Sequence, residues 1–105
     1  ALRRAARLGD GWVGAGNTVD EATEILQQLS RLRAEAGRAH EPFEAIVPLT
    51  VPATADSVKR LADLGADGMV NYPFVYTCGR GASLQQKLDM MKRYGDEMIR
   101  PMQGV

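Results

Sequence analysis

The chain has few of the residues that mark a specialised class of protein. Its 105 residues include one cysteine, Cys78, one histidine, His40, and one tryptophan, Trp12. A single cysteine excludes an internal disulfide and fits a reducing compartment, so we expect a cytoplasmic protein. The sequence contains no Cys/His cluster and no His-Glu-x-x-His motif, and it therefore gives no support for a metal site.

The chain also lacks an excess of charge of either sign. Thirteen Lys and Arg residues balance thirteen Asp and Glu residues, so we expect neither nucleic acid nor an anionic membrane as a partner. No apolar run approaches the roughly 18 residues that a membrane helix needs, and no signal peptide is visible. Hydrophobic residues make up 45% of the chain, which is typical of a globular domain and excludes a disordered one.

Hydrophobic periodicity predicts four helices that alternate with three strands. Two helices open on capping boxes, Thr18 with Glu21 and Ser83 with Gln86. We expect helices over residues 1–8, 18–36, 54–64 and 83–100, and strands over residues 11–15, 45–51 and 68–72. Strands separated by helices are joined by right-handed crossovers. The sequence therefore predicts an α/β fold, a parallel sheet made of three βα units in one domain, 1–105.

The middle strand, residues 45–51, is too apolar to be half exposed, and we expect both of its faces to be covered. Pro48 cannot donate to a ladder, so we expect an edge or a bulge beside it. A sheet of three strands keeps two free edges, and a chain of this size buries only about 65% of its unfolded surface. We therefore expect further burial against other chains.

The last helix is expected to turn an apolar stripe toward the core. The stripe consists of Leu84, Leu88, Met91 and Met98, with Tyr94 alongside. Met90, Met91 and Met98 are expected to fill the core and not to form a binding site. We expect this helix to end at Pro101, because proline cannot continue a helix.

The first dozen residues, Ala-Leu-Arg-Arg-Ala-Ala-Arg-Leu-Gly-Asp-Gly-Trp, resemble the helix-to-strand segment of bacterial luciferase-like monooxygenases. The resemblance continues through residues 33–38 and 60–67 and spans nearly the whole chain. The Leu-Gly-Ala-Asp pattern before the third strand is shared by many α/β barrels, so the first dozen residues are the distinctive part. The resemblance implies an eight-stranded α/β (TIM) barrel and a flavin- or deazaflavin-dependent oxidoreductase, of which this chain would be the C-terminal portion.

A complete barrel of this kind needs about 250 residues. The resemblance places the family's glycine-rich cofactor-phosphate segment just before Ala1, and the earlier strands that contact the flavin ring before that. We therefore expect a piece of a longer protein that is inactive alone and binds no cofactor by itself. The full-length enzyme would use FMN or a deazaflavin, a choice that these residues leave open, together with a small-molecule substrate.

Functional groups of such barrels lie where the strands end. Gly16 and Asn17 follow the first strand, where backbone N–H groups at a helix start can hold an anion. The alternative is a tight turn that leads into the Thr18 cap. Thr50, at the end of the middle strand, offers a hydroxyl to a ligand or satisfies the backbone of the next turn. These residues are candidate cofactor- or substrate-binding positions, and no catalytic residue is identified.

Arg80 is the last candidate, in the loop after the third strand. Its guanidinium suits a phosphate or a carboxylate, and a solvated loop arginine is the alternative. Cys78 lacks the pattern of a catalytic thiol, and we expect packing or a free thiol. His40 is expected to be solvated, and Trp12 is expected in the core or the barrel wall.

Two hypotheses about function remain open. In the first, the chain is part of a luciferase-like flavin- or deazaflavin-dependent monooxygenase or oxidoreductase. In the second, it is a non-catalytic α/β module that forms homo-oligomers through its exposed sheet edges.

Overall fold

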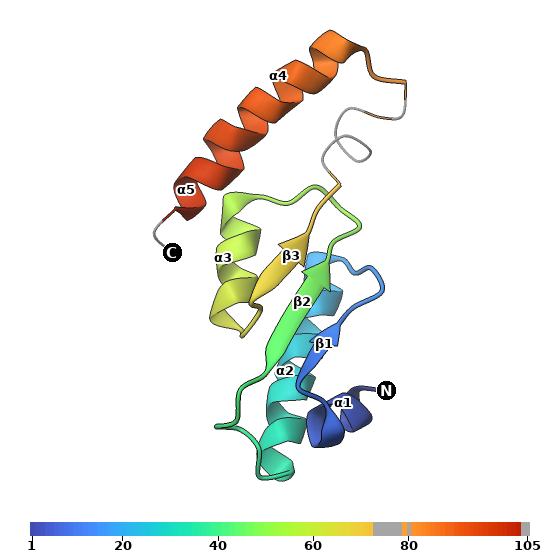
Figure 1. Cartoon of the computed structure of the whole chain (residues 1–105), viewed down its shortest axis with the longest axis vertical. Coiled ribbons are helices and arrows are strands. Elements are labelled where there is room, and N and C mark those ends of the chain that lie inside the picture. Colours follow the sequence, from blue (N-terminus) through green and yellow to red (C-terminus); the bar gives the residue numbers. More distant parts are fainter. Residues whose placement is uncertain (73–78, 80, 104–105) are drawn as a thin grey trace.

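A computed structural model describes residues 1–72, 79 and 81–103 of the chain. It shows a three-stranded parallel sheet with helices between the strands (Figure 1). The predicted fold class, three βα units of a parallel sheet, is therefore confirmed.

The strands lie side by side in the order in which they occur in the chain. They are β1 (Gly11–Val13), β2 (Glu44–Pro48) and β3 (Gly68–Val70). The register places Val13 beside Ile46, and Ile46 beside Gly68. Each strand is shorter than the sequence predicts, because the ladder ends where the chain turns into the next helix.

One helix precedes the first strand, and the others connect the strands or follow the last one. They are α1 (Leu2–Leu8), α2 (Val19–Glu35), α3 (Ala55–Asp63), α4 (Leu84–Tyr94), the π-helical turn η2 (Gly95–Ile99) and α5 (Arg100–Met102). The capping boxes predicted at Thr18 and Ser83 are both present. A third one, at Thr54, was missed because Ser57 stands where the motif has Glu or Gln.

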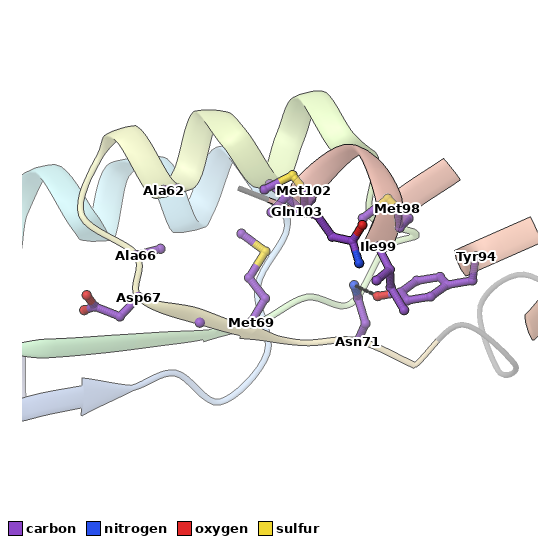
Figure 2. A pocket seen from close by; sticks show the side chains of 12 residues that line it. Ala62, Ala66, Asp67, Met69, Asn71, Tyr94, Met98, Ile99, Met102 and Gln103 are labelled. Atoms are coloured by element: carbon purple, nitrogen blue, oxygen red, sulfur yellow. Dashed lines mark hydrogen bonds between the residues drawn. The ribbon is translucent and has the colours of Figure 1, made fainter. Parts of the chain in front are cut away.

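The hydrophobic core lies between the sheet and two helices, α2 and α3, which cover the same face of the sheet (Figures 1 and 2). Alternate residues of the middle strand and its end point into this core, as the pleat requires. The buried cluster consists of Ala22, Leu26, Ala45, Val47, Leu49 and Leu61. Trp12 packs against the cluster, as expected for a core residue.

The opposite face of the sheet, which we call the open face, consists of Val13, Ile46, Pro48 and Val70. Val13 is 69% exposed and Val70 is 37% exposed. The expectation that both faces of the middle strand are covered is therefore wrong for the described residues. The apolar run predicts a strand with both faces covered, but the two crossover helices, α2 and α3, pack on the same face of the sheet.

The bulge expected beside Pro48 is present. Gly14 N–H donates to the Ile46 carbonyl at 3.1 Å, and Asn17 N–H donates to the Pro48 carbonyl at 2.9 Å. Residues 14–16 leave the ladder between these two bonds, at the point where Pro48 has no N–H to offer. From Val13 to Asn17 the chain advances four residues while its partner advances three, from Ile46 to Leu49, so the extra residue lies beside Pro48.

The last helix differs from its prediction. Leu84, Leu88 and Met91 are 74%, 49% and 59% exposed, whereas Met90 and Met98 are buried. The predicted stripe is therefore wrong for its first three members, and the core positions expected for Met90 and Met98 are confirmed. The π turn η2 adds a residue to one turn, and this shift places Met98 on the side of Met90.

Pro101 does not end the helix as predicted. The N–H of Arg100 donates to the Gly95 carbonyl, five residues back, and Pro101 lies in the first turn of α5. Pro101 continues the π turn without a break in the helix, and the helix ends one residue later, at Met102.

Candidate functional site

The loops after β1 and β2 meet at the C-terminal end of the sheet. Asn17 and Leu49 form an isolated parallel bridge, and Thr50 N–H donates to the Asn17 carbonyl at 3.0 Å. The structure thus brings three of the four predicted site residues, Gly16, Asn17 and Thr50, into one place. Arg80 and Cys78 lie outside the described residues.

Gly16 has a backbone φ of +131°, a conformation that side chains rarely adopt. A Cβ atom on Gly16 would lie 3.1 Å from Cγ2 of Thr50, whose side chain is exposed. The loop therefore approaches Thr50 closely and needs glycine for two separate reasons. Gly16 therefore presents backbone atoms, and no side chain, to a molecule bound at this edge of the sheet.

The side chain of Asn17 turns inward. Its Oδ1 is buried and has no hydrogen-bond partner. The same oxygen lies 2.7 Å from the position that a Cβ of Gly14 would take, next to the Trp12 ring. A ligand at this loop would therefore meet backbone atoms before it met the carbonyl oxygen of Asn17.

The side chain of Thr18 is engaged as the N-cap of α2. Its Oγ1 accepts the Glu21 N–H at 3.2 Å and lies 3.1 Å from Oε1 of the same residue. The alternative interpretation, a turn that leads into the cap of α2, is therefore part of the structure. It does not prevent the backbone of residues 14–17 from lining a ligand site.

Sequence reasoning missed a contact at the end of β3. Asn71 Nδ2 donates to the Tyr94 hydroxyl at 2.9 Å, which joins the end of the strand to α4 (Figure 2). The two side chains border a cavity of about 640 Å³ between β3, α3 and the C-terminal helices. Most of its lining is apolar: Val58, Ala62, Ala66, Met69, Met98, Ile99 and Met102. No signal in the sequence indicates this cavity, because it depends on where the last helix lies.

A second cavity, of about 390 Å³, lies between the loop after β2 and α4. Pro52, Met90 and Tyr94 contribute to its wall, and Arg93 and Glu97 bring opposite charges to it. Its position at the C-terminal ends of β2 and β3 is where α/β proteins place ligands.

Arg38 stabilises the opposite, N-terminal end of the sheet through hydrogen bonds. Its guanidinium donates to the carbonyls of Ala6 at 3.1 Å and Gly9 at 3.0 Å, which caps α1. Its Nε donates to a carboxylate oxygen of Glu41 at 2.6 Å. This hydrogen bond, aided by the positive charge, lowers the pKa of Glu41 below its ordinary value of 4.5.

Two further side chains hold backbone groups at this end. Arg33 donates to the carbonyls of Arg38 and Glu41 at 2.7 and 2.6 Å. Asp67, which precedes β3, accepts the N–H of Ala45 at 2.8 Å. These side chains bind backbone of their own domain, so their role is structural.

The described residues contain no group of three or more His, Cys, Asp or Glu side chains that could hold a metal ion. His40 is exposed, as expected. Within the same part of the chain, every helix is too short or too polar to cross a membrane.

No family model and no solved structure matches the chain. Three curated proteins do, all described as uncharacterized: one from Mycobacterium bovis and two from strains of Mycobacterium tuberculosis. Each is 40% identical over 101 residues, which cover 94% of this chain and 34% of the relative. The chain thus spans about a third of the length of the curated relatives it matches.

Proposed function

We propose that the chain forms three consecutive βα units of an α/β barrel that belongs to a luciferase-like flavin- or deazaflavin-dependent oxidoreductase. The observation that carries the proposal is the strand order β1-β2-β3 with α2 and α3 on one face. Taken alone, the chain is proposed to be inactive.

The strand order supports a barrel over an open, doubly wound sheet. Right-handed crossovers between neighbouring parallel strands, always in the same direction, place every helix on the same face. A doubly wound sheet reverses its strand order and covers both faces. A barrel keeps one direction and encloses its bare face, which here would be the open face of Val13, Ile46, Pro48 and Val70.

The length of the relatives supports the same architecture. Because 101 residues are 34% of each relative, a relative has roughly 300 residues, within the range of about 200 to 400 for such barrels. Five further strands with their helices fit in the remaining two thirds.

The proposal of a flavin or deazaflavin cofactor rests on the resemblance of residues 1–12 and on the position of the loop after β1. Gly16 offers backbone and Thr50 offers a hydroxyl at the strand ends, and the inward Oδ1 of Asn17 is less suited to a ligand. These groups fit one wall of a cofactor site and are too few to hold a flavin ring and its phosphate. A bound flavin would supply the redox chemistry, and this wall would help to orient it and to exclude water.

The test compares the 105-residue chain with the full-length M. bovis relative. Each is titrated with FMN and with a deazaflavin coenzyme, and binding is followed by fluorescence quenching. We expect the relative to quench one of the two coenzymes and the isolated chain to quench neither. A relative that binds neither coenzyme would overturn the proposed oxidoreductase.

Among the described residues β1 and β3 each pair only with β2, and Val13 and Val70 on these strands are exposed, which favours a second candidate. In this candidate the chain is a non-catalytic module that forms homo-oligomers through its sheet edges. Gel filtration with light scattering tests it: a monomer at micromolar concentration contradicts the candidate, and a dimer or larger species supports it.

A further inference from the structure

We propose that the two cavities beside Asn71 and Tyr94 form one binding site for a free α-amino acid with a large apolar side chain. The described walls of the site come from α3, the loop after β2, the end of β3 and the C-terminal helices, and residues 14–17 are not among them. The inference goes beyond the proposed oxidoreductase and does not depend on it.

The two cavities are neighbours that share part of their walls. Asn71, Tyr94 and Met98 line both of them, and the hydrogen bond from Asn71 Nδ2 to the Tyr94 hydroxyl lies at the shared wall (Figure 2). Their volumes, about 640 and 390 Å³, lie within the range of about 300 to 1,000 Å³ that is typical of small-molecule sites. A ligand that extends past Asn71 and Tyr94 would therefore occupy both cavities.

The larger cavity offers space for an apolar side chain. Met69 of β3 and Met98 and Met102 of the C-terminal helices line it, together with Val58 and Ala62 of α3. Methionine side chains are flexible and polarizable, so they adapt to apolar groups of different shapes. This wall therefore suits an aliphatic or an aromatic side chain.

The smaller cavity carries one positive and one negative group, Arg93 and Glu97. The guanidinium of Arg93 lies 3.4 Å from Sδ of Met90, and neither charged side chain forms an ion pair with a described residue. Asp96 and Arg100, at the same spacing in the next turn, do form an ion pair, at 3.2 Å. The acid precedes the base in that pair, which is the more favourable order on a helix. Arg93 and Glu97 have the opposite order, and both charges remain available to a ligand that carries one charge of each sign.

Two uncharged groups at the shared wall complete the site. The Tyr94 hydroxyl accepts a hydrogen bond from Asn71 and keeps its own hydrogen to donate, and Asn71 keeps Oδ1 as an acceptor. Neither group has a further partner among the described residues. A carboxylate can be bound by Arg93 together with the Tyr94 hydroxyl. An ammonium group can be bound by Glu97 together with Asn71 Oδ1.

The position of the site in the fold favours a ligand over a gap in the packing. The π turn η2 supplies Glu97 and Met98 to the walls, and single π turns inside α-helices are frequent at functional sites. The smaller cavity lies at the C-terminal ends of β2 and β3, where α/β proteins bind small molecules. The opposite charges select the head group, and the apolar cavity selects the side chain.

The experiment titrates the 105-residue chain with L-phenylalanine, without flavin, by isothermal titration calorimetry. Three further probes each lack one part of the ligand: 3-phenylpropionate has no ammonium group, phenethylamine has no carboxylate, and glycine has no side chain. Each probe should bind about tenfold more weakly than L-phenylalanine or worse, because each leaves one part of the site without its partner.

Variants of the chain test the same contacts from the protein side. Arg93→Met and Glu97→Gln should each weaken the binding of L-phenylalanine about tenfold, because each removes one charged hydrogen-bonding group. Ala62→Leu should also weaken it, because the larger side chain fills the apolar cavity. Lys92→Met is the matched control for Arg93→Met: Lys92 is exposed and is not among the residues that line the two cavities, so the variant should bind as the parent does. Circular dichroism establishes that each variant is folded.

Three results would overturn the proposal: no binding of L-phenylalanine by the parent chain up to about 10 mM, a probe lacking one part that binds as tightly as L-phenylalanine, or equal binding by Arg93→Met and Lys92→Met. The readout is independent of the proposed chemistry, because no flavin is present. Amino-acid binding by the chain leaves the oxidoreductase untouched, and flavin binding by the M. bovis relative leaves the amino-acid site untouched.

Discussion

The two ends of the sheet differ in how their polar groups are used. At the N-terminal end, Arg38, Arg33 and Asp67 bind backbone carbonyls and an N–H of the same domain. At the C-terminal end, the loop after β1 depends on Gly16, whose φ of +131° side chains rarely adopt. Each end also holds one buried polar atom without a hydrogen-bond partner, Arg33 Nε at the N-terminal end and Asn17 Oδ1 at the C-terminal end. The N-terminal end is therefore held by side chains that bind backbone, whereas the loop at the C-terminal end depends on a backbone conformation that favours glycine.

This difference matches the division of labour in α/β barrels, where the N-terminal end of the strands stabilises and the C-terminal end binds. A side chain placed at a φ that favours glycine is strained, and such strain costs stability. Substitutions at the two ends should therefore affect stability differently.

The largest effect is expected at Arg38. Arg38→Met removes the donors to Ala6 and Gly9 and the partner of Glu41. Because charged hydrogen bonds to partly buried groups are lost, the free energy of unfolding should fall by about 2 kcal/mol in urea denaturation. Arg31→Met, at an exposed position of α2, should change it by less than about 0.5 kcal/mol. Equal effects of the two would show that the hydrogen bonds of Arg38 do not stabilise the N-terminal end.

The substitution Gly16→Ala tests the backbone conformation at the C-terminal end of the sheet. Gly16→Ala should lower the free energy of unfolding by about 1 to 2 kcal/mol, because alanine is strained at a φ of +131° and its Cβ would crowd Thr50. The control is Gly95→Ala, which has helical φ and ψ and open space around the added methyl. It should stabilise the chain by about 0.5 kcal/mol. A neutral Gly16→Ala would show that the loop is relaxed in solution.

Two substitutions, one at each end of the sheet, test the comparison of the two ends directly. Asp67→Ala removes the acceptor of the Ala45 N–H and should cost about 1 kcal/mol. Asn17→Ala removes an oxygen that has no partner, so the free energy of unfolding should change by less than about 0.5 kcal/mol. Chemical denaturation of both variants checks this order, and a larger loss at Asn17 would reverse it.

The smallest effect is a pH dependence at Glu41. Its pKa is lowered by the hydrogen bond from Arg38, so the ionised carboxylate stabilises the fold above pH 4.5. That contribution is lost as the pH falls through the lower folded-state pKa. The melting temperature of Glu41→Gln should therefore lie slightly below that of the parent at pH 7, and the two should converge in acid. Glu24→Gln, exposed on α2, should show no such convergence.

Local chemistry in the sequence was sufficient for the alternation of helices and strands, for two caps and for the bulge beside Pro48. A capping box is decided within four residues, and a missing N–H affects only the neighbouring strand. The meeting of Gly16, Asn17 and Thr50 also followed, because parallel strands bring their C-terminal ends to the same edge.

Contacts between distant segments could not be predicted in this way. Arg38 reaches Ala6 and Gly9 across about thirty residues, and no pattern around Arg38 marks it as a cap. The inward side of α4 was misassigned at Leu84, Leu88 and Met91, which precede the π turn, because apolar residues lie on more than one side of this helix and contacts with other segments decide which side is buried. Tyr94, which accepts a hydrogen bond from Asn71, fixes the side that faces the domain.

The π turn has a consequence for changes of chain length. Deleting one residue from Gly95–Ile99 would let the backbone close into ordinary α-helical turns, so the deletion would cost little locally. Because the turn already delays the helical phase by one residue, everything downstream would keep its orientation after a deletion ahead of Met98, and Met98 would stay on its buried side. The same deletion within α4, where the turns are regular, would rotate everything downstream by about 100°.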